Sequence, residues 1–236
     1  MNIHPCGDRA LTVELGDRID EGVNARVCKL AALISQTKLP GVQETVPTFR
    51  ALLVLYDPGI TSYPKLRRAL TRLLAKCEHA DAAGGRIFEL PVLYNGPDLP
   101  DVAAHAGISE SEVVARHSKP AYLIYMLGFL PGFAYLGGLD PSIVTPRLTT
   151  PRTKIPAGAV GIGGEQTGVY PLDSPGGWRL IGMTPVKPYD PGREEPILYR
   201  AGDRIRFIPV DQAVYDKIRA EVEAGTYRVR VTGGSV

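Results

Sequence analysis

Three basic side chains in a proline-rich stretch are the first candidates for chemistry in this sequence. Arg147, Arg152 and Lys154 lie close together, with a proline before, between and after them. Proline restricts the backbone and can hold neighbouring cations in fixed positions, which is what recognition of a phosphate or a carboxylate requires. A solvated basic turn is the alternative explanation, and charge alone favours it.

An aromatic segment, GFLPGFAYLGG, precedes these cations at residues 128–138. Its glycines and prolines free or fix backbone angles, while its rings supply packing area. The combination predicts an ordered loop with special dihedral angles. The residues alone leave open whether this loop is a corner buried by its own rings or a binding surface. Its candidate ligand-binding residues are Phe129, Pro131, Gly132, Phe133 and Tyr135.

Two glycine-rich stretches follow. AGAVGIGGEQTGVYP, at residues 157–171, has amides that can approach an anion, but it lacks both the Gly-Lys-Ser/Thr of a phosphate loop and the context of a dinucleotide fold. A glycine-rich hairpin is the plainer interpretation. SPGGWRLIGMTP, at residues 174–185, holds the only tryptophan, which is typical of a core anchor after a turn. The candidate binding residues here are Gln166, Tyr170, Gly176, Gly177 and Trp178.

His117 ends a predicted helix, where it can act as a cation at the helix C-terminus or as a general base. The cation is favoured, because no catalytic partner is visible in the sequence. The nearest carboxylates to the glycine-rich stretches, Glu165 and Asp173, have no spacing that defines a metal site. No metal ligands are therefore predicted.

Composition limits the class of protein. The 236 residues are 44% hydrophobic and 22% charged, with a formal charge of +2, so neither a nucleic-acid nor a membrane partner is indicated. Cys6, Cys28 and Cys77 are widely spaced and form no Cys-x-x-Cys pair, which predicts reduced, mostly buried thiols. No signal peptide and no apolar run of membrane-spanning length are evident, so we expect a cytoplasmic protein.

The first third of the chain alternates strands and helices, as judged from apolar periodicity. The predicted order is a strand at 9–15, a helix at 21–35, strands at 42–49 and 51–57, a helix at 63–77 capped by Ser62, and a strand at 86–94. That order is typical of ferredoxin-like α+β domains. Residues 79–85 loosen the chain, so we expect a boundary there, between a domain over 1–85 and a second over 86–236.

The second part begins with short helices at 101–107 and 109–117, the latter opened by a capping box of Ser109 and Glu112. Short β-prone runs then follow, interrupted by glycine and proline about every ten residues, which predicts an all-β barrel or sandwich. A helix at 214–225 and a closing strand at 226–233 complete the expected elements.

Taken in order, these segments resemble a known family. The resemblance covers nearly the whole chain and rests on GDRALTVELGD, VPTFRALLVLYDP, LPVLYNGPDLPDVA, GFLPGFAYLGGLD, PAGAVGIGGEQTGVYPLDSPGGWRLIGMTP and AGDRIRF. The family is that of the bacterial 5-oxoprolinase B subunit, also described as allophanate hydrolase subunit 1 and as carboxyltransferase subdomain C/D, and it includes KipI-like kinase inhibitors. One departure is Met183, where relatives usually carry arginine, so one possible cation is missing.

The resemblance implies an N-terminal ferredoxin-like α+β domain followed by a mainly-β cyclophilin-like barrel domain. It implies ATP-dependent opening of 5-oxo-L-proline to L-glutamate, with ATP as co-substrate accompanied by Mg²⁺ and with no tightly bound cofactor. The implied partners are the C subunit of 5-oxoprolinase, which is similar to allophanate hydrolase subunit 2, and the A subunit. Because no nucleotide fold is recognisable in this chain, we expect it to be inactive without them.

For that activity, Arg147, Arg152 and Lys154 are the candidate catalytic cations, expected to point together at one anion, with His117 as a further catalytic candidate. Loss of Arg152 is expected to reduce activity and to leave thermal stability nearly unchanged. Two other functions stay open. One is a KipI-like regulator that binds and inhibits a sensor histidine kinase, and the other is a carboxyltransferase-like subunit acting on urea- or allophanate-type substrates.

Overall fold

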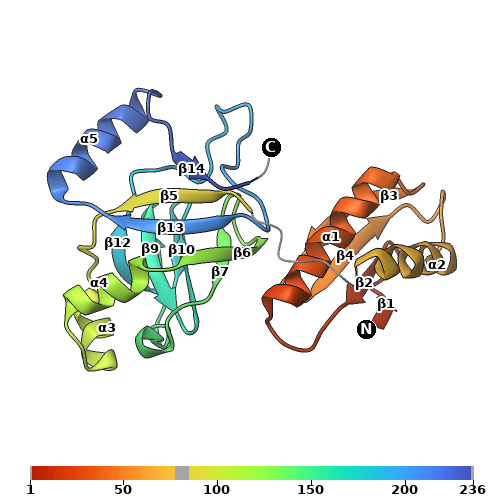
Figure 1. The fold of residues 1–236 in the computed structure, drawn as a ribbon, viewed down its shortest axis with the longest axis horizontal. Helices are drawn as coiled ribbons and strands as arrows, with labels where there is room; N and C mark the ends of the chain where they lie inside the picture. Colours follow the sequence, from red (N-terminus) through yellow and green to blue (C-terminus); the bar gives the residue numbers. More distant parts are fainter. Residues whose placement is uncertain (1, 78–84, 235–236) are drawn as a thin grey trace. The chain divides into compact units, whose positions relative to one another are not determined.

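The computed structural model describes residues 2–77 and 85–234. The chain divides into two compact units, unit 1 over Met1–Ala83 and unit 2 over Gly84–Val236 (Figure 1). The stretch 79–85, which we expected to loosen the chain, lies outside the described residues except for Gly85. No described helix combines the length and the apolar character needed to cross a bilayer.

Unit 1 is an antiparallel four-stranded sheet with two helices (Figure 1). The strands, in the spatial order β1-β2-β4-β3, and the helices are β1 (Asn2–Pro5), β2 (Ala10–Glu14), β3 (Val42–Pro47), β4 (Ala51–Tyr56), α1 (Glu21–Thr37) and α2 (Tyr63–Leu74), followed by a 3-10 turn at Ala75–Cys77. Asp20 caps α1 by accepting a 3.0 Å hydrogen bond from the amide of Val23. Ser62 stands at the predicted N-cap of α2, but its side chain makes no capping bond.

Both helices pack on one face of this sheet. Strand alternation places Leu11, Val13, Leu52 and Val54 on that face with no exposed surface. The apolar stripes of α1 and α2 join the same buried cluster. This two-layer packing follows from periodicities that the sequence displays locally.

The strand predicted to complete unit 1 belongs to unit 2. It is β5 (Ile87–Val92), which pairs in parallel with β13 (Arg204–Pro209) and antiparallel with β14 (Arg230–Thr232). Most of β5 is buried on both faces, as suits a central strand. In unit 1 the position beside β2 is taken by β1, a strand that the sequence did not predict. A short β1–β2 hairpin forms there at a low cost in loop-closure entropy.

Unit 2 is built on an eight-stranded sheet with helices beside it. The sheet's spatial order is β12 (Arg179–Met183), β9 (Ala159–Gly163), β10 (Gln166–Val169), β7 (Ala134–Gly137), β6 (Ala121–Leu127), β13, β5 and β14. Figure 1 shows α5 (Gln212–Glu223) on a different side of this sheet from α3 (Leu99–Ala106) and α4 (Glu110–Ser118). A buried cluster centred on residues such as Phe88, Tyr122 and Phe207 forms the core.

The strand ladders of unit 2 do not close into the predicted barrel. Their order is open, and β12 and β14 are its edges among the described strands. One residue after β5, however, Leu93 exchanges two backbone hydrogen bonds of 2.9 Å with Met183 of β12. The amides of Gly96 and Asp98 then donate to backbone oxygens of the same strand, at 3.1 and 3.0 Å. The chain leaving β5 is thereby tied to the far edge of the sheet without a regular ladder.

Gly96 is the residue on which this tie depends most, because a Cβ there would overlap the Leu180 carbonyl and the Ile181 backbone. We expect Gly96→Ala to destabilise unit 2 by about 2–3 kcal/mol, as overpacking of a close backbone contact does. Urea unfolding followed by Trp178 emission measures this. Gly128→Ala is the matched control, because its new Cβ would lie 3.7 Å or more from its neighbours. Equal stability of the two variants would contradict the prediction.

Candidate functional site

The side chain of Trp178 packs on the β9–β10 hairpin, where glycines leave room for the indole. In the β9–β10 pair, Gly163 faces Gln166 and Gly161 faces Gly168. A Cβ at Gly163 would overlap the indole, a Cβ at Gly168 would lie 3.2 Å from it, and a Cβ at Gly161 would lie 3.3 Å from Trp178 Cβ. The indole occupies this space and is only 4% exposed. The glycines of this stretch therefore serve packing, and Gln166 shares the hairpin face that carries the indole.

Four more aromatic rings surround Trp178 and form with it what we call the aromatic layer. The ring centroids of Phe133 and Tyr170 lie 5.5 and 6.0 Å from that of Trp178, in edge-to-face contacts. Tyr135 and Phe129 extend the group, at 5.1 and 5.6 Å from Phe133. Phe133 and Tyr170 are buried, whereas Phe129 is 62% exposed. Five of the predicted binding residues thus meet in one layer.

The loop that carries Phe129 is ordered, as predicted. The Tyr199 hydroxyl donates a 2.9 Å hydrogen bond to the Gly132 carbonyl, and the Phe133 amide donates to a carbonyl three residues back at 3.0 Å. Phe129 has a φ of 67°, a left-handed conformation that is costly for a bulky residue, and Pro131 beside it is exposed. Strained backbone combined with an exposed ring is typical of binding surfaces.

A separate two-stranded sheet borders this layer, made of β8 (Arg152–Ile155) and β11 (Ser174–Gly176). A Cβ at Gly176 would lie 2.6 Å from the Tyr170 hydroxyl, so only glycine allows this approach. The carbonyl of Gly177 accepts a 2.7 Å hydrogen bond from the Leu148 amide. The Gly176–Gly177 pair therefore connects the aromatic layer to the basic loop.

The three predicted cations have different partners. Arg152 Nη2 lies 2.7 Å from Asp98 Oδ1, and Lys154 Nζ lies 2.8 Å from Asp173 Oδ2. Arg147 stacks on the aromatic layer, with its Cζ 5.8 Å from the ring centroid of Trp178. The expectation that the three cations point at one anion is therefore wrong for this conformation. Two of them contact carboxylates of the same chain.

Asp98, which sequence reasoning missed, gives Arg152 a structural role. Asp98 is 4% exposed, and its Oδ2 accepts a 2.6 Å hydrogen bond from the Leu180 amide while Oδ1 accepts from Arg152. One carboxylate at the start of α3 thus connects that helix to β8 and β12. Without Arg152 this buried charge would lose its counter-ion. This contact favours a structural role for Arg152 over the expected small contribution to stability.

The Lys154 pair differs in its exposure. The side chains of Lys154 and Asp173 are 72% and 53% exposed. The hydrogen bond with Asp173 raises the pKa of Lys154, and the same bond lowers the pKa of Asp173. Exposed pairs of this kind contribute little to stability, so Lys154 can leave Asp173 at low cost.

His117 lies in the core of unit 2 with no exposed surface. Thr167 donates its hydroxyl to the Gly161 carbonyl at 2.9 Å, so it accepts from His117 Nε2 at 2.7 Å. The other nitrogen, Nδ1, then accepts from the Tyr94 hydroxyl at 2.7 Å. Burial lowers the pKa of His117 to about 3.

This placement corrects the prediction for His117. The residue is a neutral member of a buried hydrogen-bond chain, so the favoured role as a cation at the helix C-terminus is wrong. A general base has to reach the proton that it removes, and this imidazole has no exposed surface. The chain of hydrogen bonds ends at the carbonyl of Gly161, a residue that packs against Trp178. His117 therefore helps to hold the strand on which Trp178 packs.

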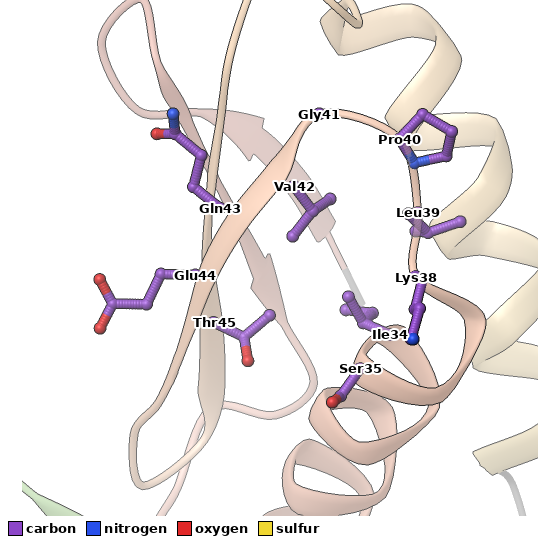
Figure 2. A pocket seen from close by; sticks show the side chains of 10 residues that line it. All are labelled: Ile34, Ser35, Lys38, Leu39, Pro40, Gly41, Val42, Gln43, Glu44 and Thr45. Carbon is purple, nitrogen blue, oxygen red and sulfur yellow. The ribbon is translucent and has the colours of Figure 1, made fainter.

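A hollow in unit 1 contains none of the predicted residues. Figure 2 shows it between the end of α1 and the start of β3, with Lys38 and Glu44 as its charged groups. Their side chains point away from each other in this view. Within residues 2–77 and 85–234 there is no cluster of three or more His, Cys, Asp or Glu suited to a metal ion. The aromatic layer with Arg147 is therefore the candidate site.

The first prediction from this site concerns Arg152. We expect Arg152→Ala to lower the free energy of unfolding by about 2–4 kcal/mol, because it leaves a buried carboxylate without its counter-ion. Chemical denaturation measures the loss. Lys154→Ala, on the same strand but in an exposed pair, is the control and should unfold at the wild-type midpoint. A fully stable Arg152→Ala protein would show that Asp98 does not need this partner.

The second prediction concerns pH. The folded-state pKa of His117 is about 3, below its ordinary value of 6.5, so only the unfolded chain takes up this proton at mildly acidic pH. The contribution of His117 to the free energy of unfolding is therefore fully present above the ordinary histidine pKa of 6.5. It decreases as the pH falls, by about 2 kcal/mol between about pH 7 and about pH 5. We expect His117→Gln to flatten this part of the stability curve. His105→Gln, at an exposed histidine, should leave it unchanged.

Comparison with known proteins agrees with this fold and with these segments. A family model described as carboxyltransferase domain, subdomain C and D, matches residues 1–199. The chain is 40% identical over 232 residues to the 5-oxoprolinase B subunit of Bacillus subtilis, covering 93% of this chain and 97% of that protein. It is 26% identical to urea amidolyase of Saccharomyces cerevisiae, of which it spans 14%.

Among solved structures, the crystal structure of TTHA0988 superposes with a TM-score of 0.78 at 41% identity. The match covers 86% of this chain and 40% of that longer chain. The family model covers more than half of the sequence, and the identity to the Bacillus subtilis protein extends over nearly all of both chains. The protein therefore belongs to the family of 5-oxoprolinase B subunits, within the group defined by carboxyltransferase subdomains C and D.

Proposed function

We propose that this chain is the B subunit of an ATP-dependent 5-oxoprolinase complex, which converts 5-oxo-L-proline to L-glutamate with hydrolysis of ATP. The observation that carries the proposal is the 40% identity to a protein named as a 5-oxoprolinase B subunit, over 93% of this chain and 97% of that one. The urea amidolyase relative is more distant, at 26% identity, and supports a urea-type substrate less well.

The chemistry of the proposed reaction explains the need for ATP. A lactam is a resonance-stabilised amide that water attacks slowly. Transfer of the γ-phosphoryl group to the lactam oxygen releases ADP and makes that oxygen a leaving group. Water then adds to the ring carbon and the ring C–N bond breaks, which leaves an acyl phosphate on the opened chain. A second water hydrolyses this acyl phosphate to L-glutamate and inorganic phosphate. Catalysis of such a transfer consists mainly of positioning and charge stabilisation.

We propose that this chain supplies part of the site and that the A and C subunits supply the rest. MgATP enters as a co-substrate, and no tightly bound cofactor is required. Arg147 and the aromatic layer are the surface that this chain contributes, while Arg152 holds that surface in place. On its own the chain is then inactive.

We further propose the finer architecture implied by the family. Unit 1 is ferredoxin-like with β1 in the place of the usual last strand, which the order β1-β2-β4-β3 supports. Unit 2 is cyclophilin-like with an open strand order, and the Leu93–Met183 bridge between the end of β5 and β12 supports this likeness. Cys6, Cys28 and Cys77 are free thiols, which suits a reducing compartment, and we place the protein in the cytoplasm.

Co-expression with candidate A and C subunits, followed by an assay of oxoproline-dependent ADP release and glutamate formation, tests this function. We expect activity in the assembled complex and none in the chain alone. Omitting oxoproline controls for unrelated ATP hydrolysis. Urea in place of oxoproline tests the urea-type alternative. A stable complex that forms no glutamate from oxoproline would rule the proposal out.

A further inference from the structure

Arg147 is the predicted cation that the fold leaves available. Arg152 and Lys154 lie 2.7 and 2.8 Å from carboxylates, whereas no carboxylate within residues 2–77 and 85–234 lies within ion-pair distance of Arg147. Arg147 is exposed and stacks on Trp178. Stacking occupies the face of a guanidinium and leaves the N–H groups at its edge free to donate.

The backbone around Arg147 is fixed by neighbouring strands. The amide of Leu148 donates to Gly177 at 2.7 Å, and the Arg179 side chain donates to the Pro146 carbonyl at 3.4 Å. Arg179 is itself paired with Asp101 at 2.8 Å. The cation is therefore presented from an anchored segment, so binding an anion requires little ordering of the chain.

A second polar group, Ser174, lies beside the same layer without a partner. Ser174 is 8% exposed, and its hydroxyl has no hydrogen bond within the described part of the chain. It is directly opposite Ile155 in the β8–β11 pair, so these two side chains lie on one face of that sheet. Ile155 packs in the same buried cluster as Phe133, Tyr170 and Trp178. Ser174 therefore lies beside the aromatic layer.

Tyr170 lies close to the segment that contacts Arg147. A Cβ at Gly176 would lie 2.6 Å from the Tyr170 hydroxyl, and a Cβ at the next residue, Gly177, would lie 3.9 Å from Arg147 Cβ. Burial raises the pKa of Tyr170, so its hydroxyl keeps its hydrogen. That hydrogen can be donated to a ligand oxygen.

The net charge of Arg147, Tyr170 and Ser174 together indicates which kind of ligand fits them. One available guanidinium matches one carboxylate, which it can bind through two parallel N–H···O bonds. The phosphates of a nucleotide carry several negative charges and are bound in enzymes by several cations together. Two uncharged hydroxyls beside a single cation therefore suit a small monocarboxylic acid better than a triphosphate.

We propose that Arg147, Tyr170 and Ser174 bind the carboxylate of a small cyclic acid against the aromatic layer, and that the nucleotide phosphates bind elsewhere. The identity of the acid as 5-oxo-L-proline rests on the proposed function. The carboxylate site itself follows from the contacts of Arg147, Tyr170 and Ser174.

Trp178 makes a direct test possible, because it is the only tryptophan and it contacts Arg147. The purified full chain is titrated with 5-oxo-L-proline, with its uncharged amide and with inorganic pyrophosphate, while Trp178 emission is followed. We expect a saturable change with 5-oxo-L-proline below about 10 mM, and binding of the amide weaker by about tenfold or more.

Variants identify the groups involved. Arg147→Gln should weaken binding of 5-oxo-L-proline by about tenfold or more. Arg147→Lys should weaken it by less, because lysine keeps the positive charge but cannot donate two parallel N–H···O bonds. Lys187→Gln, at an exposed lysine, is the control for a general loss of positive charge. Ser174→Ala should weaken binding and raise the midpoint of thermal unfolding, because it removes a buried hydroxyl that lacks a partner.

Three results would overturn the inference: no emission change with 5-oxo-L-proline, equal binding of the acid and its amide, or saturable binding of pyrophosphate that Arg147→Gln abolishes. The two proposals fail separately. If the complex is active but this chain shows no Arg147-dependent binding, the proposed carboxylate site is wrong and the proposed function stands. If the complex forms no glutamate but this chain still binds the acid through Arg147, the proposed function is wrong and the proposed carboxylate site stands.

Discussion

The packing of Trp178 on the glycine face of the β9–β10 hairpin is the interaction on which the candidate site depends. A side chain at position 163 would overlap the indole, and side chains at positions 161 and 168 would crowd Trp178. With the indole seated there, its edges contact Phe133 and Tyr170, and its face is available to Arg147. A stretch that looks from its sequence like a weak phosphate loop is therefore the floor of an aromatic layer.

The two faces of that hairpin have complementary tasks. One face holds Trp178, and the other contributes Thr167 to the buried hydrogen-bond chain that runs through His117 to Tyr94. A fully bonded polar chain in a core fixes side-chain orientation, because any other arrangement leaves a buried donor or acceptor without a partner. The hydrogen-bond chain thus orders the hairpin on the face that carries Thr167, while the opposite face packs against Trp178 of the aromatic layer.

The Asp98–Arg152 pair fixes the site from the side. A carboxylate removed from solvent needs its counter-ion and its hydrogen bonds, so α3, β8 and β12 are held together at one point. This use of Arg152 changes the electrostatics of the basic loop. Of the three cations in this loop, Arg152 and Lys154 contact carboxylates, whereas Arg147 contacts none within residues 2–77 and 85–234. The proposed monocarboxylate site rests on this difference.

Features that depend on local pattern could be predicted from the residues alone. The helices at 21–37 and 63–74, the alternating strands β2 and β4, the capping by Ser109 and the ordered aromatic loop all follow from periodicity, caps and backbone preferences within a few residues. The family also follows from the sequence, because it rests on ordered segments. These signals are short in range, so they can be recognised without knowing which strands pair.

Features that join distant residues became visible only in the folded chain. The partner of Arg152 is 54 residues earlier in the sequence, and β5 pairs with β13, more than a hundred residues later. His117 has the sequence context of a helix-ending cation, yet it is neutral because the strands packed around it exclude water. Pairing and burial of this kind depend on the three-dimensional neighbours of a charge, and no spacing along the chain encodes those neighbours.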